Sequence, residues 1–353
     1  MKEFWSDRIR SLTPYTPGEQ PKGRKFIKLN TNENPYPPSP KALAAIQANT
    51  DASLRLYSDP DAADLRAAIA KTYSVKPEQV FVGNGSDEVL AFAFQAFYSE
   101  GAEIVFPDIT YSFYPVYANM FGICYRTVPL KDDFTVPVDA LCGGNDGVVI
   151  ANPNAPTGME LPQGEIRRIL EANPNVVVIV DEAYVDFGGE SVLPLVEEYP
   201  NLLVVQTFSK SRALAGLRVG FAFGCENLIQ ALNCVKNAIN SYTLDRLALA
   251  GAAASVADKE YFNIQCAKVV ATRERTTEEL RKQGFTVYPS KTNFIFVSHP
   301  VVPAKELFAG LREKGILVRY FAQPRIDNCL RVSIGTDEEM DAFLNAMREL
   351  TAQ

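Results

Sequence analysis

A carboxylate and a phenol follow one of the most apolar runs of the chain. Asp181 comes directly after the run Val176 to Val180, and Tyr184 stands three residues later. Such short β-branched runs are typical of buried strands in a parallel sheet, and ligands of open α/β sheets bind beyond the carboxyl ends of the strands. We therefore expect Asp181 to face a site, where it could hold a positively charged ring nitrogen. Taken alone, a helix cap at the end of the strand is the simpler explanation.

A lysine follows the next apolar run. Thr207-Phe208-Ser209-Lys210 comes after Leu202 to Gln206, and Arg218 stands eight residues beyond the lysine. A lysine directly after a buried strand is costly unless it is paired, exposed or used covalently, and a free amine can form a Schiff base. Ser209 and Arg218 supply donors suited to an anion. Each residue alone would be an ordinary loop residue, but their combination with the acid and phenol of the preceding strand favours a site.

Two loops add weaker signals. In the segment 82–88, Gly83 and Gly85 would let the backbone approach an anion at the start of a helix. This is not the dinucleotide fingerprint, because Glu88 stands where a third glycine is required, and a nicotinamide dehydrogenase is therefore disfavoured. The segment 152–158 reads Asn-Pro-Asn-Ala-Pro-Thr-Gly and would place an amide over the sheet edge. A plain turn explains either loop equally well.

The composition excludes several other chemistries. The 353 residues carry 35 Lys and Arg against 42 Asp and Glu, a net charge of −7, with a single histidine, His299. One histidine cannot build a multi-histidine metal site, and we expect no metal. A negative net charge disfavours a nucleic-acid partner. The six cysteines are scattered without a CxxC pair, which indicates reduced thiols and a cytoplasmic location. Neither a signal peptide nor an apolar run long enough for a membrane helix is evident.

The alternation of short apolar runs and helical segments along the chain predicts an α/β fold with a second, smaller unit. Prolines punctuate residues 1–40, which we expect to form an N-terminal arm. Residues 41–245 are expected to form a large domain whose mostly parallel sheet is covered by helices on both faces, and residues 246–353 a small α+β domain. The strands expected in the large domain are Gln79–Val82, Glu103–Phe106, Gly147–Ala151, Val176–Val180, Leu202–Gln206 and Val219–Phe223. Those of the small domain are Phe294–Val297, Ile316–Arg319 and Leu330–Ile334, before a helix around Glu338–Leu350.

Together these motifs resemble the fold-type I, pyridoxal-phosphate-dependent aminotransferases of class I and II. The resemblance covers nearly the whole chain, and its core is Asp181-x-x-Tyr184 with Ser209-Lys210-x7-Arg218. It implies a seven-stranded sheet in the large domain, a pyridoxal 5′-phosphate cofactor and a homodimer. Four further segments resemble one subgroup of that family: 12–15, 29–36, 56–61 and 329–336.

The resemblance implies a role for each site residue. Lys210 would bind the cofactor as a Schiff base and shuttle a proton, Asp181 would pair with the pyridinium nitrogen, and Tyr184 would contact the 3′-oxygen. Tyr111 would stack on the ring; the alternative is a core tyrosine. The phosphate would be held by Gly85, Ser86, Asp87, Ser209 and Arg218, and by Tyr57 of the neighbouring subunit.

The substrate would be bound by Arg331, Arg319 and Tyr15, a set that suits a dianionic phosphate and also the carboxylates of glutamate. For Arg319, a surface strand position is an equal alternative. The expected reaction transfers the amino group of histidinol phosphate, a phosphorylated amino alcohol, to the 2-oxo acid 2-oxoglutarate, as in histidine biosynthesis. The alternatives are an aromatic or other amino-acid aminotransferase and a threonine-phosphate decarboxylase.

Two positions depart from the family. Ala155 stands where the family usually has the asparagine that contacts the 3′-oxygen, and we expect Asn154 to take over that contact or Tyr184 to make it alone. Ser58 follows Tyr57 where the family usually has proline. A non-catalytic regulator built on the same fold would carry an additional DNA-binding domain. That alternative is disfavoured, because the fold is expected to begin within about 40 residues of Met1 and the charge is negative.

Overall fold

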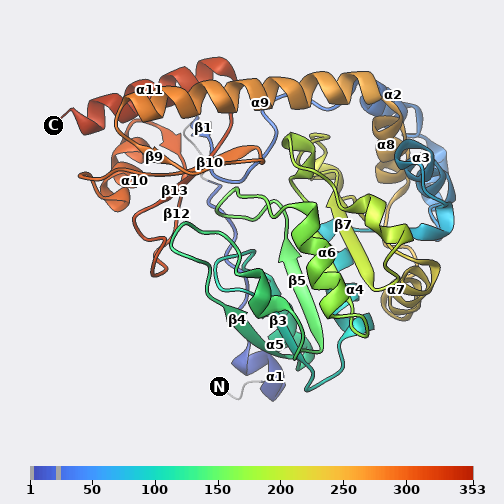
Figure 1. Ribbon diagram of the computed structural model, residues 1–353. Coiled ribbons are helices and arrows are strands. Elements are labelled where there is room, and N and C mark those ends of the chain that lie inside the picture. The colour runs from blue at the N-terminus through green and yellow to red at the C-terminus, as the bar shows by residue number, and fades with distance from the viewer. Residues whose placement is uncertain (1–3, 21–24, 353) are drawn as a thin grey trace.

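The computed structural model describes residues 4–20 and 25–352, so that residues 1–3 and 21–24 of the expected arm, and residue 353, lie outside it. Figure 1 shows a central sheet between layers of helices, with a smaller unit beside it under the long helix α9. The expected α/β architecture is confirmed.

The large sheet has seven strands in the order β2-β8-β7-β6-β5-β3-β4. All of them run parallel except β8, which is antiparallel to both of its neighbours. The strands are β2 (Val80–Gly83), β3 (Glu103–Pro107), β4 (Cys124–Val128), β5 (Gly147–Ala151), β6 (Val178–Asp181), β7 (Leu202–Thr207) and β8 (Gly220–Phe223). Six of these match the expected runs. The seventh, β4, was not expected, because it is a largely exposed edge strand without an apolar run.

Helices cover both faces of this sheet because successive residues of each strand point to opposite sides. Val178 and Val180 of β6 pack with α3 (Ala63–Tyr73), α6 (Gln163–Ala172) and α8 (Arg246–Ala257). Ile179, between them, packs on the other face with α4 (Gly85–Phe97), α5 (Tyr114–Phe121) and α7 (Glu226–Ile239). The helix α2 (Pro40–Ala48) lies against α8 (Figure 1).

The smaller unit is built on an antiparallel four-stranded sheet in the order β12-β13-β10-β9. Its strands are β9 (Thr286–Val287), β10 (Phe294–Ser298), β12 (Arg319–Tyr320) and β13 (Leu330–Ser333), and its helices are α9 (Lys259–Lys282), α10 (Ala304–Glu313) and α11 (Asp337–Thr351). The expected strand Ile316–Arg319 is wrong as a single element. Its first half, β11 (Ile316–Leu317), pairs instead with β1 (Ile27–Lys28) of the arm.

The N-terminal arm thus contacts both units. Its strand β1 pairs with the smaller one, while α1 (Asp7–Ser11) lies beside α5, where Arg8 donates to the carbonyl oxygen of Met120. The boundary between the domains stays a prediction. The buried residues of α8 belong to the core of the large sheet, and this packing favours a boundary near Asp258, after α8, over the expected one after residue 245.

Short 3₁₀ helices connect the main elements: η1 (Ala52–Arg55), η2 (Pro77–Gln79), η3 (Val138–Leu141), η4 (Val185–Phe187), η5 (Leu193–Glu197) and η6 (Ala215–Leu217). The six cysteines are free thiols. His299 lies in a loop, where its Nδ1 accepts hydrogen bonds from the N–H groups of Val301 and Val302. Within the described residues no helix is long and apolar enough to cross a membrane.

Candidate active site

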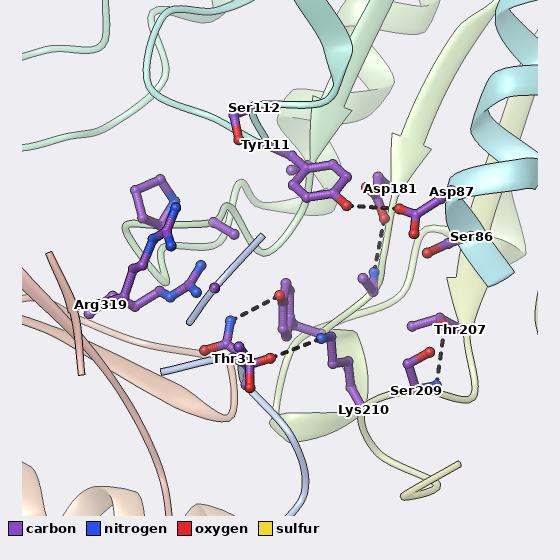
Figure 2. Close-up of a pocket in the computed structure, with 18 of the residues that line it drawn as sticks. Thr31, Ser86, Asp87, Tyr111, Ser112, Asp181, Thr207, Ser209, Lys210 and Arg319 are labelled. Carbon is purple, nitrogen blue, oxygen red and sulfur yellow. Dashed lines mark hydrogen bonds between the residues drawn. The ribbon is translucent and has the colours of Figure 1, made fainter. Parts of the chain in front are cut away.

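A pocket of about 240 Å³ opens beyond the carboxyl ends of β6 and β7, between the two units. It is the place where the topology of a parallel sheet predicts a ligand. Figure 2 shows side chains from the large domain, the arm and the smaller unit converging on it. The expected residues that line it are Tyr15, Ser86, Asp87, Tyr111, Asp181, Tyr184, Ser209, Lys210, Arg218, Arg319 and Arg331.

The N-terminal arm binds both the side chain and the backbone of Lys210. Its Nζ donates to the carbonyl oxygen of Thr31 at 3.4 Å (Figure 2), and its own carbonyl oxygen accepts from Nδ2 of Asn34 at 3.1 Å. The Nζ also lies 5.8 Å from the ring centre of Tyr184. The amine therefore reaches into the pocket, and among the described residues no carboxylate is hydrogen-bonded to it.

Asp181 is buried at the end of β6. Its carboxylate accepts hydrogen bonds from the hydroxyl of Tyr114 at 3.0 Å and from the N–H of Ala183 at 3.2 Å. Burial nevertheless raises the pKa of Asp181 to about 6, because the two hydrogen bonds only partly offset the loss of solvation. A cation placed against this carboxylate would restore its charged form.

An anion cradle lies where α4 begins, at the opposite side of the pocket from Arg319 (Figure 2). Gly85 has a φ of +82°, and a Cβ there would stand 2.6 Å from Nη2 of Arg218. A Cβ on Gly220 would stand 2.3 Å from the backbone nitrogen of Ser86. Glycine at both positions therefore permits two backbone segments and the guanidinium of Arg218 to approach one another closely at the start of a helix, a place that favours anions.

Asp87 organises the side chains of this cradle. Its Oδ1 accepts from the hydroxyl of Tyr111 at 2.8 Å, and its Oδ2 accepts from Nη2 of Arg218 at 3.1 Å (Figure 2 for Tyr111). Burial and the nearby Asp87 hold the pKa of Tyr111 well above its usual value. Tyr111 is thus a neutral phenol, fixed in position along the wall of the pocket.

Two arginines form the other end of the pocket. Arg331 is enclosed between the rings of Phe294 and Phe321, at 5.4 and 5.7 Å, and burial lowers its pKa. Its Nη2 donates to the carbonyl oxygen of Asn30 at 3.2 Å, but its buried Nε has no partner among the described residues. Arg319 lines the same end. A half-buried guanidinium that pairs with no carboxylate among the described residues is costly, and an anionic ligand would satisfy it.

Tyr15 brings the arm over this region. Its ring stacks on Phe113 at 4.3 Å and stands 6.3 Å from the ring of Tyr111. The arm residue thus lies beside the residue expected to stack on the cofactor.

Three expected residues do not line the pocket of this chain. Gly85 lies just beneath the cradle, as described. Asn154 is turned away, because its amide donates to the carbonyl oxygen of Ile109 and to Thr157, and accepts from Thr110, all within 2.9 to 3.0 Å. The expectation that Asn154 replaces the asparagine missing at 155 is therefore not supported: its hydrogen bonds brace the loop.

Tyr57 is the third. Its side chain is 78% exposed and stacks on Tyr242 at 4.4 Å, away from the pocket of its own chain. Such exposure leaves Tyr57 available to another subunit.

One segment and one further residue of the site were not expected from the sequence. The segment Thr31–Asn34 contacts Lys210 and Tyr184, although the sequence indicated only that it resembles one subgroup of the family. Its dense run of polar side chains after the buried Leu29 was the available signal. The other residue is Tyr114. A tyrosine among aromatic residues is typical of a hydrophobic core, and only the structure shows that its hydroxyl donates a hydrogen bond to Asp181.

Comparison with known proteins points in one direction. The family model described as aminotransferase class I and II matches residues 24–347. A histidinol-phosphate aminotransferase of Clostridium acetobutylicum is 55% identical over 352 residues, covering 100% of both chains. One of Aromatoleum aromaticum is 55% identical over 354 residues, covering 99% of both. The crystal structure of histidinol-phosphate aminotransferase from Sinorhizobium meliloti in complex with pyridoxal-5′-phosphate superposes with a TM-score of 0.90, at 26% identity, over 100% of this chain and 98% of that one.

Proposed function

Because this chain belongs to the class I and II aminotransferase family, we propose that it transfers the amino group of histidinol phosphate to 2-oxoglutarate. The products are imidazole acetol phosphate and glutamate, and the reaction is a step of histidine biosynthesis. The observation that carries the proposal is the 55% identity, over the full length of both chains, to a protein of that activity. The pocket supports it, since it has anion-binding groups at both ends.

The residues of the pocket fit pyridoxal phosphate. The cradle at the start of α4, with the hydroxyl of Ser209 and the guanidinium of Arg218, suits its phosphate. Asp181 suits a protonated ring nitrogen, because burial raises the pKa of its carboxyl to about 6, and a cation beside it would favour the charged form. Lys210 supplies the amine for covalent attachment.

When bound, this cofactor supplies a ring that accepts the electron pair left when the Cα of the donor loses its proton. The amine of Lys210, which enters the pocket, would move the proton between Cα of the donor and C4′ of the cofactor. Asp181 would hold the ring nitrogen in its protonated form, and Tyr111 would stack on the ring. Residues of the arm and of the small sheet would enclose the cofactor from the side opposite the large sheet.

Arg331 and Arg319 bind the anionic end of either substrate. A guanidinium fork binds a phosphate or a carboxylate with two parallel hydrogen bonds. The two arginines therefore bind the phosphate of histidinol phosphate in one half-reaction and a carboxylate of glutamate in the other. Tyr15 adds a phenol from the arm.

A side-by-side assay tests the assignment. Purified protein loaded with pyridoxal phosphate is offered histidinol phosphate, phenylalanine or threonine phosphate, each with 2-oxoglutarate, and glutamate is measured. We expect kcat/KM for histidinol phosphate to exceed that for phenylalanine by at least about 10²-fold, because the single carboxylate of phenylalanine cannot pair with both arginines as a dianionic phosphate does. Preference for phenylalanine, or release of carbon dioxide from threonine phosphate, would contradict it.

The protein is further proposed to act in the cytoplasm as a homodimer in which Tyr57 binds the cofactor phosphate of the partner subunit. Exposed apolar side chains support a second copy at this surface: Leu54, Leu56, Tyr57, Ile239 and Tyr242. Tyr57→Ala and Lys210→Ala chains can be co-expressed to test it. A mixed dimer has one intact site only if Tyr57 acts across subunits, so activity above that of either variant alone is expected. No gain on mixing would mean that Tyr57 serves its own chain or neither.

A further inference from the structure

The hydroxyl of Tyr184 is tied to the small sheet through one asparagine of the arm. Nδ2 of Asn32 donates to the hydroxyl oxygen of Tyr184 at 3.0 Å. On its other side, Asn32 exchanges two hydrogen bonds with Ser333 of β13. Asn32 and Ser333 are both at most 2% exposed, so water does not compete for these bonds.

The direction of each hydrogen in this chain of bonds follows from one backbone group. The N–H of Asn32 can only donate, and it donates to Oγ of Ser333 at 2.8 Å. The hydroxyl hydrogen of Ser333 must then go elsewhere, and it meets Oδ1 of Asn32 at 2.9 Å. With its oxygen taken up by Ser333, the amide presents its NH₂ group to Tyr184. Tyr184 therefore accepts, and its own hydrogen is free to point into the pocket that it lines.

The backbone of Asn32 is built for this position. Its φ is +55°, in the left-handed region that asparagine tolerates better than most residues. Its carbonyl oxygen accepts from Nδ2 of the buried Asn293 at 2.9 Å. Two hydrogen bonds thus fix the backbone of Asn32, and a third, donated by Ser333 to Oδ1, orients its side-chain amide.

The loop 152–158, which follows β5, places no side-chain amide in the lining of the pocket. At 155 the residue facing the pocket is alanine, and the amide of Asn154 is engaged within its own loop. Because this loop supplies no other side-chain amide donor, the direction of the Tyr184 hydrogen decides whether a ligand oxygen beside Tyr184 receives a hydrogen bond.

We propose that Asn32, oriented by Ser333, is a positioning residue that makes Tyr184 a hydrogen-bond donor to the 3′-oxygen of pyridoxal phosphate. The proposal rests on the cofactor and not on the identity of the amino donor. A hydrogen bond donated to the 3′-oxygen stabilises its negative charge and weakens its hold on the proton that it shares with the nitrogen linking the cofactor to Lys210. The strength of this donor therefore sets the pH at which the visible absorption of the bound cofactor changes.

The experiment measures that pH midpoint, and the dissociation constant of pyridoxal phosphate, without any amino donor. Failure of the histidinol phosphate assignment would leave both quantities unaffected. The key variant is Asn32→Asp, which keeps the shape and the Ser333 contact but has no N–H to give, so its carboxylate takes the hydrogen of Tyr184. We expect the midpoint to rise by about one pH unit or more and the cofactor to bind about tenfold more weakly.

Two further variants separate positioning from a general effect of charge or folding. In a Tyr184→Phe background, Asn32→Asp should add little further shift, because the group through which it acts is gone. Adding Ala155→Asn to Asn32→Asp should lower the midpoint again by supplying a new donor. If Asn32→Asp does not fold, Ser333→Ala carries the same two measurements, with a smaller shift in the same direction.

An unchanged midpoint in Asn32→Asp would overturn the proposal. So would a shift that persists in full in the Tyr184→Phe background, since that shift would come from the added charge or from a distorted arm.

Discussion

Tyr114 donates a hydrogen bond of 3.0 Å to Oδ2 of Asp181 beneath the pocket, and neither residue is more than 6% exposed. A buried helix residue thereby stabilises the ionised form of the acid that is expected to hold the cofactor nitrogen. In this environment burial raises the pKa of Asp181 to about 6, and the hydrogen bond limits the rise.

The variant Tyr114→Phe should weaken cofactor binding about tenfold near neutral pH. The reason is that a hydrogen bond to a charged group contributes about 1.5–3 kcal/mol, and its loss favours the protonated acid. Titration of the cofactor-free protein with pyridoxal phosphate measures the change. Tyr98→Phe is the matched control, since its buried hydroxyl donates to the carbonyl oxygen of Val177 instead. Equal losses in both variants would indicate a general packing effect.

The stability of the cofactor-free protein should depend on pH through Asp181. Its pKa is about 6 when folded, against an ordinary value of 3.8. Between these values the folded protein keeps a proton that the unfolded chain has lost, so the free energy of unfolding falls as pH rises. The decrease is at most about 3 kcal/mol, since each pKa unit is worth 1.36 kcal/mol.

Asp181→Asn should remove that dependence. Urea unfolding of the cofactor-free wild type and variant at pH 4 and pH 7 measures it, and the variant is expected to gain on the wild type at pH 7. Glu182, whose pKa burial raises to about 7, is unchanged in both proteins and cancels in the comparison. A constant difference between the two proteins across this range would contradict the prediction.

Lys210→Ala should abolish the yellow colour of the enzyme and lower turnover by at least about 10³-fold, because both covalent attachment and proton transfer are lost. Absorption spectra and an amino-transfer assay give the two readouts. Lys236→Ala is a useful control, since that lysine is buried outside the pocket and donates to the carbonyl oxygen of Pro60. A wild type that stays colourless with added pyridoxal phosphate would contradict the assignment of Lys210.

Arg331→Lys should raise KM for both substrates by about 10- to 100-fold, because lysine cannot form two parallel hydrogen bonds and its charge would be buried without the enclosing ring contacts.

Arg319→Ala should raise KM for histidinol phosphate more than for glutamate, since a dianion needs both cations. Steady-state kinetics with each substrate decides this. The exposed Arg348, replaced by alanine, serves as the control, and an unchanged KM for histidinol phosphate in Arg319→Ala would place Arg319 outside the phosphate site.

Tyr15→Phe should raise KM for histidinol phosphate by about threefold to tenfold, the effect of one lost hydrogen bond. The stacking of the ring on Phe113 is kept in this variant, so the change reports on the hydroxyl alone. Unchanged KM and kcat would show that the arm covers the pocket without binding the substrate through this hydroxyl.

Much of the site could be predicted because strand ends are local features. Asp181, Ser209 and Lys210 each follow an apolar run, and parallel strands bring their carboxyl ends to one edge of a sheet. Their convergence therefore followed from the pattern alone. The split of Ile316–Arg319 between two sheets could not be predicted in this way, because a run of apolar residues does not specify which strand it will pair with.

By itself, the sequence determined the class of chemistry and the family: a lysine, an acid and a phenol at strand ends, next to a glycine turn that opens a helix. Only the tertiary structure decided how those groups are tuned. Tyr114 lies 67 positions from Asp181, and Ser333 lies 301 positions from Asn32. No local pattern encodes such pairs, because the direction of a buried hydrogen bond depends on which donors and acceptors the packing of distant segments brings together.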